Sequence, residues 1–233
     1  MTWTIGVAGG LTLVRCAALD SVPGIAHAFG TRTGPGGVPF DAASHATALA
    51  EAAGVGRPIV QPLRQVHGTF IATADARPGE ADGVLVTLGD RGAAVRSADC
   101  VPILVASRDG HAFAAVHAGW RGIAAGIVNA AVDRFEGEGI PPEHLVAAIG
   151  PAIRACCYEV GPEVLDALGL PSSRTVDLPA IVAERFTARG VPAAQVAIAP
   201  WCTRCRSDLF YSARGEGTGT GRMLSVVGPA GAP

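Results

Sequence analysis

The sequence is poor in aromatic, charged and methionine residues. Of its 233 residues, 5% are Phe, Trp or Tyr, 16% are charged and 49% are hydrophobic. The core must therefore be filled mainly by Ala, Val, Leu and Ile, and long disordered tails are not expected. A chain of this length buries about 70–75% of its unfolded surface, so it needs no disulfides to fold. We expect one compact domain spanning residues 1–233.

No stretch reaches the roughly 18 apolar residues that a membrane-spanning helix requires, so no membrane association is expected. The net charge of −2 provides no general attraction to nucleic acid. The first residues also lack the basic, apolar and small-residue pattern of a secretory signal. We expect a cytoplasmic protein whose six cysteines are thiols or metal ligands rather than disulfides.

Short segments rich in Val, Ile and Ala and bounded by Gly, Asp or Pro predict strands at residues 11–15, 26–30, 83–87, 93–98, 102–107, 112–117, 146–149 and 195–199. Those between residues 83 and 117 are joined by short turns, including an Arg108-Asp109-Gly110 hairpin, which favours antiparallel or mixed sheets. Helices are expected at 43–53, 123–135, 162–168 and 178–189. Strands and helices do not alternate regularly, so the fold class is α/β of the α+β type, not a doubly wound sheet.

Three residues that bind transition metals stand in short motifs: His67 in QVHG, Cys100 in ADCVP and His117 in HAGWRG. The hairpin between Cys100 and His117 could bring both side chains to one rim of a sheet. Two imidazoles and one thiolate leave a fourth tetrahedral position open, as in a catalytic rather than a structural zinc site. We therefore expect a zinc enzyme, with copper as a possible substitute.

The spacing of these three residues does not by itself establish a role as metal ligands. A histidine bonded to the backbone and a cysteine acting as a small core residue are commoner roles. The surrounding glycines favour the ligand role, because Gly68, Gly119 and Gly122 follow closely on the candidate ligands. Glycine is typical of places where the backbone must approach a substrate.

Together with IGPAI at 149–153, CCYEVG at 156–161 and TGR at 220–222, these motifs resemble the YfiH-like family of laccase-domain, or multicopper polyphenol oxidoreductase, proteins. The resemblance runs from about residue 26 to 227. It implies a compact sandwich of mixed β-sheets flanked by helices, related to cysteine-containing toxin deamidases. It also implies metal ligands at His67, Cys100 and His117. The implied activity is phosphorolysis of adenosine, inosine and methylthioadenosine, with deamination of adenosine.

Phosphorolysis requires a bound phosphate, which the paired donors of guanidinium groups suit. Five arginines lie beside glycines or ligand motifs: Arg32, Arg64, Arg121, Arg214 and Arg222. Arg32 and Arg214 are the favoured phosphate ligands, and a solvated side chain is the alternative for each. Both lie where the sequence departs from the family pattern, in TRTG at 31–34 and SARG at 212–215.

The remaining cysteines include CTRC at 202–205 and an adjacent pair at 156–157, which could form a second zinc site. Neighbouring residues of an extended chain point in opposite directions, so we expect buried thiols there instead. By the same argument the side chain of Asp99 should point away from that of Cys100 and form a structural hydrogen bond.

Three enzymatic functions compete. The favoured one is a zinc-dependent purine nucleoside enzyme whose partners are a nucleoside and phosphate, with the oligomeric state open. A copper oxidase of phenols needs several coppers and many histidines, but the chain has six histidines, no His-x-His pair, and only Met1 and Met223 as axial candidates. A metal-free hydrolase acting in peptidoglycan editing would use Cys100 as nucleophile and a histidine as base. A non-enzymatic binding module is the fourth possibility.

Overall fold

A computed structural model describes residues 2–33, 46–55, 58–61, 64–74, 79–87 and 91–231. The strands within these ranges form two six-stranded sheets. The first sheet has the order β1 (Trp3–Ala8), β2 (Leu11–Cys16), β3 (Ile25–Gly30), β12 (Met223–Pro229), β7 (Gly92–Ser97) and β4 (Ile59–Val60). The second has the order β11 (Val196–Ile198), β10 (Leu145–Ile149), β8 (Val101–Ser107), β9 (Ala112–Ala118), β6 (Gly83–Thr87) and β5 (Ile71–Thr73).

Both sheets are mixed, as the short turns between strands predict. Most neighbouring strands are antiparallel, whereas β4 pairs with β7, β5 with β6, and β11 with β10 in parallel. The helices are α1 (Ala17–Asp20), α2 (Ala46–Ala53), α3 (Trp120–Ala125), α4 (Ile127–Gly137), α5 (Pro162–Leu168), α6 (Leu178–Ala188) and α7 (Ala213–Glu216), with 3-10 turns at Pro142–His144 and Ala193–Gln195. No helix in the described part of the chain is long and apolar enough to cross a bilayer.

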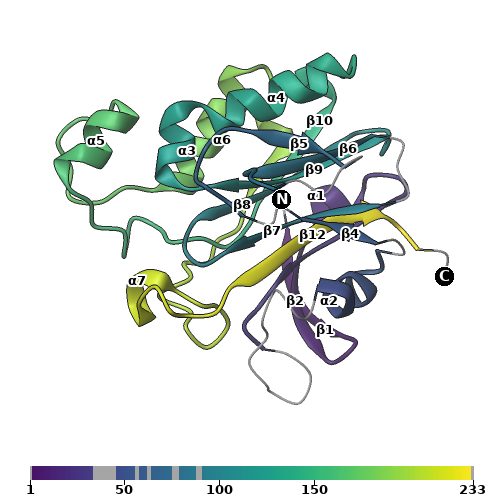
Figure 1. The fold of residues 1–233 in the computed structure, drawn as a ribbon, viewed down its shortest axis with the longest axis horizontal. Coiled ribbons are helices and arrows are strands. Elements are labelled where there is room, and N and C mark those ends of the chain that lie inside the picture. Colours follow the sequence, from purple (N-terminus) through teal and green to yellow (C-terminus); the bar gives the residue numbers. More distant parts are fainter. Residues whose placement is uncertain are drawn as a thin grey trace.

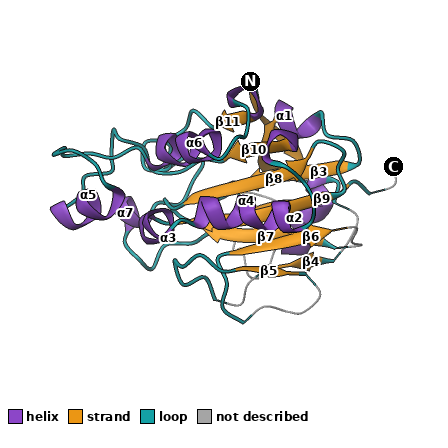
Figure 2. Ribbon diagram, turned by 90° about the horizontal axis from the view of Figure 1, so that it is seen from above, coloured by secondary structure: helices purple, strands orange, loops and turns teal. Residues whose placement is uncertain are grey.

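The sheets pack face to face, with helices on both outer surfaces (Figure 1). Helices α3, α4 and α6 cover the second sheet, and α2 covers the first. Figure 2 shows α4 and α6 lying over the strands of the second sheet. The predicted α+β sandwich flanked by helices is therefore confirmed.

Strand alternation divides the apolar residues between these layers. On β8, Ile103 and Val105 face the helices, where they join the core built around Phe135 and Phe186. Leu104, between them in the sequence, faces the first sheet instead. Both faces of this strand are buried, in keeping with its continuously apolar run from Val101 to Ala106.

Several elements differ from the sequence prediction. The single helix expected at 123–135 starts earlier, at Trp120, and breaks at Gly126, whose φ of 96° is left-handed. Strands β1, β4, β5 and β12 are not predicted by the residue patterns. Strand β12 runs through the centre of the first sheet although it ends in Gly228 and Pro229, residues that usually mark turns. The start of the helix expected at 43–53 lies outside the described residues.

The β8–β9 turn depends on Gly110, which has a φ of 76° and packs against the Pro23 carbonyl oxygen. Replacing Gly110 by Ala should lower the free energy of unfolding by about 1–3 kcal/mol, because a Cβ would be strained and would overlap that oxygen. Gly137→Ala is the matched control, since a Cβ atom at that position would have no tertiary contact within 4 Å. It should leave stability unchanged or raise it by up to about 1 kcal/mol. Denaturant unfolding of both variants checks this, and equal effects would contradict it.

Candidate metal centre

The β8–β9 hairpin brings Cys100 and His117 to one end of the second sheet. Pro102 lies opposite His117 in the antiparallel register, and Cys100 directly precedes the strand that contains Pro102. His67 reaches the same point from the loop before β5. The metal-binding atoms of the three residues all lie within 4.8 Å of one another. The predicted convergence is thus present in the structure.

The geometry within this cluster is that of side chains facing a common centre. The Cys100 Sγ atom lies 3.8 Å from His67 Nε2. The two imidazole rings meet edge to face, with centroids 4.9 Å apart. Cys100 is half-buried, His117 is buried and His67 is exposed, so the cluster opens toward solvent on the His67 side.

Asp82, which directly precedes β6, contacts both histidines of the cluster. Its buried carboxylate lies 2.9 Å from His117 Nδ1. It also accepts hydrogen bonds from the backbone N–H groups of His67 at 2.9 Å and Gly68 at 2.6 Å. Such a carboxylate fixes the orientation of an imidazole ligand and leaves its Nε2 atom for a cation. Sequence reasoning does not find Asp82, because a lone acidic residue before a strand has no characteristic spacing to the ligands.

His67 has a left-handed backbone, with a φ of 61°. This conformation is uncommon for a residue with a side chain and costs about 1–3 kcal/mol. The hydrogen bonds from the His67 and Gly68 N–H groups to Asp82 hold the loop in this form. The backbone strain therefore lies at the candidate ligand itself.

The glycines of the HAGWRG motif make room for the cluster. A Cβ atom on Gly119 would lie 2.5 Å from His67 Cδ2 and 3.2 Å from Cys100 Sγ. One on Gly122 would lie 2.8 Å from the Gly68 carbonyl oxygen. Any side chain at these positions would displace the His67 loop, so the close backbone approach expected from the sequence is present.

A cavity of about 480 Å³ opens beside the three residues. Its other lining side chains include Arg64, Arg96 and Arg222. Arg64 also pairs with Glu80, and Arg222 donates to the backbone carbonyls of its own loop, including that of Gly221 at 3.0 Å. The cavity is therefore bordered by the metal-ligand candidates and by three guanidinium groups.

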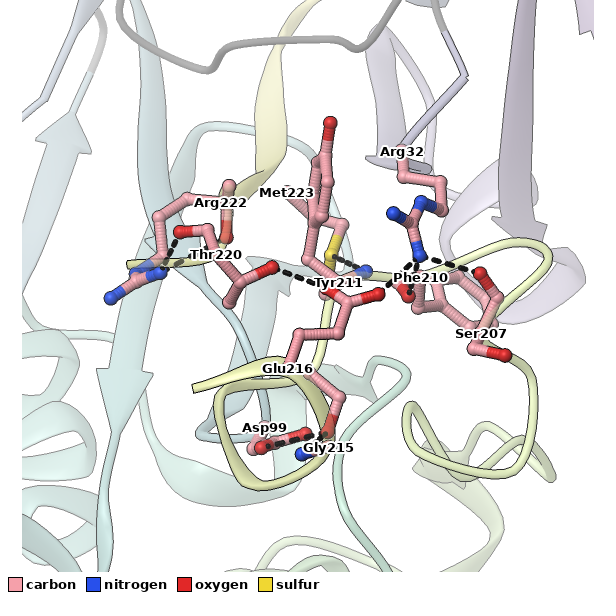
Figure 3. Close-up of polar contacts among 12 residues, drawn as sticks. Arg32, Asp99, Ser207, Phe210, Tyr211, Gly215, Glu216, Thr220, Arg222 and Met223 are labelled. Atoms are coloured by element: carbon pink, nitrogen blue, oxygen red, sulfur yellow. Dashed lines mark hydrogen bonds and ion pairs between the residues drawn. The ribbon is translucent and has the colours of Figure 1, made fainter. Parts of the chain in front are cut away.

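Arg32, one of the two favoured phosphate ligands, does not line this cavity. It donates to the Ser207 carbonyl oxygen at 2.7 Å and to Glu216 at 2.6 Å, and it stacks over Tyr211, 4.6 Å from the ring centroid. Figure 3 shows Arg32 and Arg222 on opposite sides of Tyr211 and Glu216. The contacts of Arg32 fasten the loop that contains Ser207 and Tyr211.

Arg214 and Arg121 also lie outside the cavity lining. Arg214 donates to the Glu159 carbonyl oxygen at 2.9 Å and lies over the Tyr158 ring. Arg121 lies over the ring of its neighbour Trp120, 4.4 Å from the centroid. A phosphate-binding role for either residue stays a prediction, and of the arginines expected from the sequence only Arg64 and Arg222 border the cavity.

Residues 36–230 match the family described as multi-copper polyphenol oxidoreductase laccase. The chain belongs to this family. Among its relatives, purine nucleoside phosphorylase from Bacteroides thetaiotaomicron is 40% identical over 148 residues, which are 57% of this chain and 55% of that protein. Purine nucleoside phosphorylase PA4543 from Pseudomonas aeruginosa is 35% identical, with 71% of this chain and 72% of that protein covered. Adenosine deaminase RL5, from an unknown prokaryotic organism, is 32% identical, with 72% and 74% covered.

Two solved structures share the fold. YlmD from Geobacillus stearothermophilus has a TM-score of 0.82 at 29% identity, covering 93% of this chain and 96% of that one. Bacillus licheniformis YfiH has a TM-score of 0.82 at 24% identity, covering 95% and 97%. The two-sheet architecture is therefore that of YfiH-like proteins.

The charges in this cluster of the laccase-domain protein favour a thiolate at Cys100 and an imidazolium at His117. Burial opposes ionisation of the Cys100 thiol, but His117 and His67 outweigh it and lower the pKa of Cys100 to about 6. Burial likewise disfavours protonated His117, yet Asp82 and Cys100 raise its pKa to about 9. Without a cation, the pair is a thiolate and an imidazolium at neutral pH. One thiolate and two imidazoles around a common point fit a transition-metal ion, which would replace the imidazolium proton.

Asp99, next to Cys100, has the structural role expected of it, although its backbone is not extended. Its φ is 81°, and its carboxylate accepts hydrogen bonds from the Thr203 hydroxyl at 2.5 Å and the Ser212 hydroxyl at 3.1 Å. The Arg214 backbone N–H donates to it at 2.7 Å. These contacts tie the segment after β11 to the candidate metal centre.

The expectation of buried thiols at the other cysteine motifs is wrong. Cys156 and Cys205 are exposed, Cys157 is half-buried, and of the four only Cys202 is buried. The reason is that residues 155–157 form a turn, so the alternating side-chain directions of an extended chain do not apply.

Alkylation of Cys100 should report its ionised state. In protein stripped of metal by a chelator, the rate of reaction with iodoacetamide should reach half its maximum near pH 6, because the thiol is deprotonated above its lowered pKa. Peptide mass spectrometry at a series of pH values measures this, and added zinc should suppress the reaction. A rate that rises only above about pH 8, as for an ordinary thiol, would contradict the arrangement.

Proposed function

We propose that the chain is a zinc-dependent purine nucleoside enzyme that phosphorolyses adenosine, inosine and methylthioadenosine and deaminates adenosine. The observation that carries this proposal is the convergence of His67, Cys100 and His117 on one cavity that guanidinium groups also border. Relatives over about 70% of the chain bear the names purine nucleoside phosphorylase and adenosine deaminase, which supports the substrate class. The proposal retains the expectation of a cytoplasmic enzyme with small-molecule partners, a nucleoside and phosphate.

The cavity volume of about 480 Å³ is within the range of small-molecule sites, about 300–1,000 Å³. In phosphorolysis, a phosphate oxygen bonds to C1′ of the ribose while the bond from C1′ to the purine nitrogen breaks. Arg64 and Arg222 would hold the phosphate and offset its charge. In deamination, an oxygen from water replaces the 6-amino group, which leaves as ammonia.

His67, Cys100 and His117 would hold the ion, with Asp82 fixing the ring of His117. A bound zinc ion supplies Lewis acidity to a substrate group or to water. The chain itself contributes the orientation of the two imidazoles and the exclusion of water from the buried His117 side. The proton on His117 Nδ1 stays shared with the Asp82 carboxylate, which keeps Nε2 directed at Cys100.

Multicopper oxidation, the activity in the family description, has less support. Among the described histidines, His67 and His117 alone belong to a group of metal-binding side chains. His27 is buried and accepts a hydrogen bond from the Cys16 backbone N–H, and His111 pairs with Asp109 on the surface. The centre of His67, Cys100 and His117 offers one thiolate and two imidazoles, which are too few ligands for the several coppers that oxygen reduction requires.

A metal-free cysteine hydrolase is the second candidate, and one specific observation favours it. Cys100, His117 and Asp82 are arranged in space as a triad of nucleophile, base and orienting carboxylate. The pKa of the thiol is lowered to about 6. The same geometry serves a metal site, so metal content separates the two functions.

Replacing Cys100 by Ala distinguishes them. In the zinc enzyme, metal occupancy and nucleoside turnover should fall together, because one of three ligands is lost. Metal analysis of protein purified without added metal, with adenosine and inosine turnover followed by product, measures both. A zinc content equal to that of the wild type, with complete loss of activity, would favour the cysteine nucleophile, and unchanged activity would exclude both functions for this site.

Replacing Arg64 by Ala tests phosphate binding. The loss of a charge-assisted contact worth about 1.5–3 kcal/mol should raise the KM for phosphate about 10- to 100-fold. Zinc content should stay constant, and deamination should fall much less because it uses water. Steady-state kinetics with varied phosphate measure both reactions. Arg174→Ala is the matched control, because Arg174 is exposed and does not line the cavity. Equal losses of both reactions would show that Arg64 shapes the cavity instead.

A further inference from the structure

Four cysteines that the proposed function does not use converge on one point at the surface. Their sulfur atoms, from Cys156, Cys157, Cys202 and Cys205, all lie within 4.8 Å of one another. The Cys205 sulfur lies 3.5 Å from that of Cys156 and 3.4 Å from that of Cys157. The cluster thus joins two segments that are almost 50 residues apart in the chain.

The backbone presents these thiols in an ordered way. Cys202 pairs with Ala152 in a parallel bridge, and the Thr203 N–H donates to the Ala152 carbonyl oxygen at 3.1 Å. The Arg206 N–H donates to the Cys202 carbonyl oxygen at 3.0 Å, which closes the turn that contains CTRC. A second turn, in which the Cys157 N–H donates to the Arg154 carbonyl oxygen at 2.9 Å, places both adjacent cysteines on the cluster.

The distances suit one tetrahedral ion. A Zn–S bond of about 2.3 Å gives an edge of about 3.8 Å between thiolates, close to the separations in the cluster. Disulfide bonding would join sulfurs at about 2.05 Å in pairs, but here the sulfur of Cys205 is equally near to those of Cys156 and Cys157. Four sulfur ligands with no nitrogen or oxygen ligand are typical of structural zinc.

The backbone also supports a negative charge at the first cysteine of CTRC. The backbone N–H groups of Cys205 and Arg154 donate hydrogen bonds to the Cys202 sulfur. Backbone donors directed at a ligand sulfur stabilise a thiolate whether or not a metal is bound.

We propose that Cys156, Cys157, Cys202 and Cys205 form a structural zinc site, separate from the metal centre of His67, Cys100 and His117. All four coordination positions are filled by the chain, so the ion has no open position for substrate. It fastens the segment after β10 to the segment after β11. The second of these carries Thr203 and Ser212, which bond to Asp99 beside Cys100, so the zinc site supports one wall of the metal centre.

Metal stoichiometry tests the proposal. Full-length protein purified without added metal should contain two zinc ions per chain by elemental mass spectrometry. Cys205→Ser and Cys156→Ser, both at exposed positions, should each lose one. Cys100→Ser is the matched control, because it removes a ligand of the other centre. It should keep the ion that is bound by the four cysteines. Cys100→Ser reconstituted with cobalt should show the strong thiolate-to-cobalt charge-transfer absorption of a tetrahedral four-sulfur site.

The cobalt measurement needs no substitution in the cluster, so it decides the matter even where Cys205→Ser fails to fold. Zinc content that is the same in the wild type and in folded Cys205→Ser would overturn the proposal. So would absence of the charge-transfer absorption from Cys100→Ser. A disulfide within the cluster in protein prepared without oxygen, found by peptide mass spectrometry, would also overturn it and would identify a redox pair.

Discussion

The candidate metal centre depends on one buried carboxylate. Asp82 holds the His117 ring through Nδ1 and the His67 loop through backbone N–H groups, so a single side chain sets the position of two ligands. These contacts also hold the left-handed backbone of His67. The third ligand, Cys100, is placed separately by the β8–β9 register. The site that Asp82 organises thus lies where the rigid second sheet meets the strained loop of His67.

The sequence predicts those parts of the structure whose cause is local. The strands between residues 83 and 118 follow from apolar runs and turn residues, and the Gly110 hairpin follows from its turn chemistry. Because that hairpin returns the chain to the same rim, the meeting of Cys100 and His117 is also predictable. The family motifs then indicate His67 as the third ligand.

What the sequence does not predict depends on distant partners. Arg32 bonds to Ser207 and Glu216, which lie 175 and 184 positions away, so no local pattern shows that its guanidinium is already engaged. Strand β12 is central although its sequence ends in residues typical of turns. The adjacent cysteines at 156–157 share one cluster because they lie in a turn, which the residues around them do not indicate.

The most direct test of this account is the zinc affinity of Asp82→Asn, measured by competition with a chromophoric chelator. Asparagine keeps the size of the side chain but loses the charge that orients and polarises His117. The account predicts affinity at the centre of His67, Cys100 and His117 about 10- to 100-fold weaker than in the wild type, with the fold retained. Wild-type affinity in a folded Asp82→Asn protein would contradict the claim that this carboxylate assembles the site.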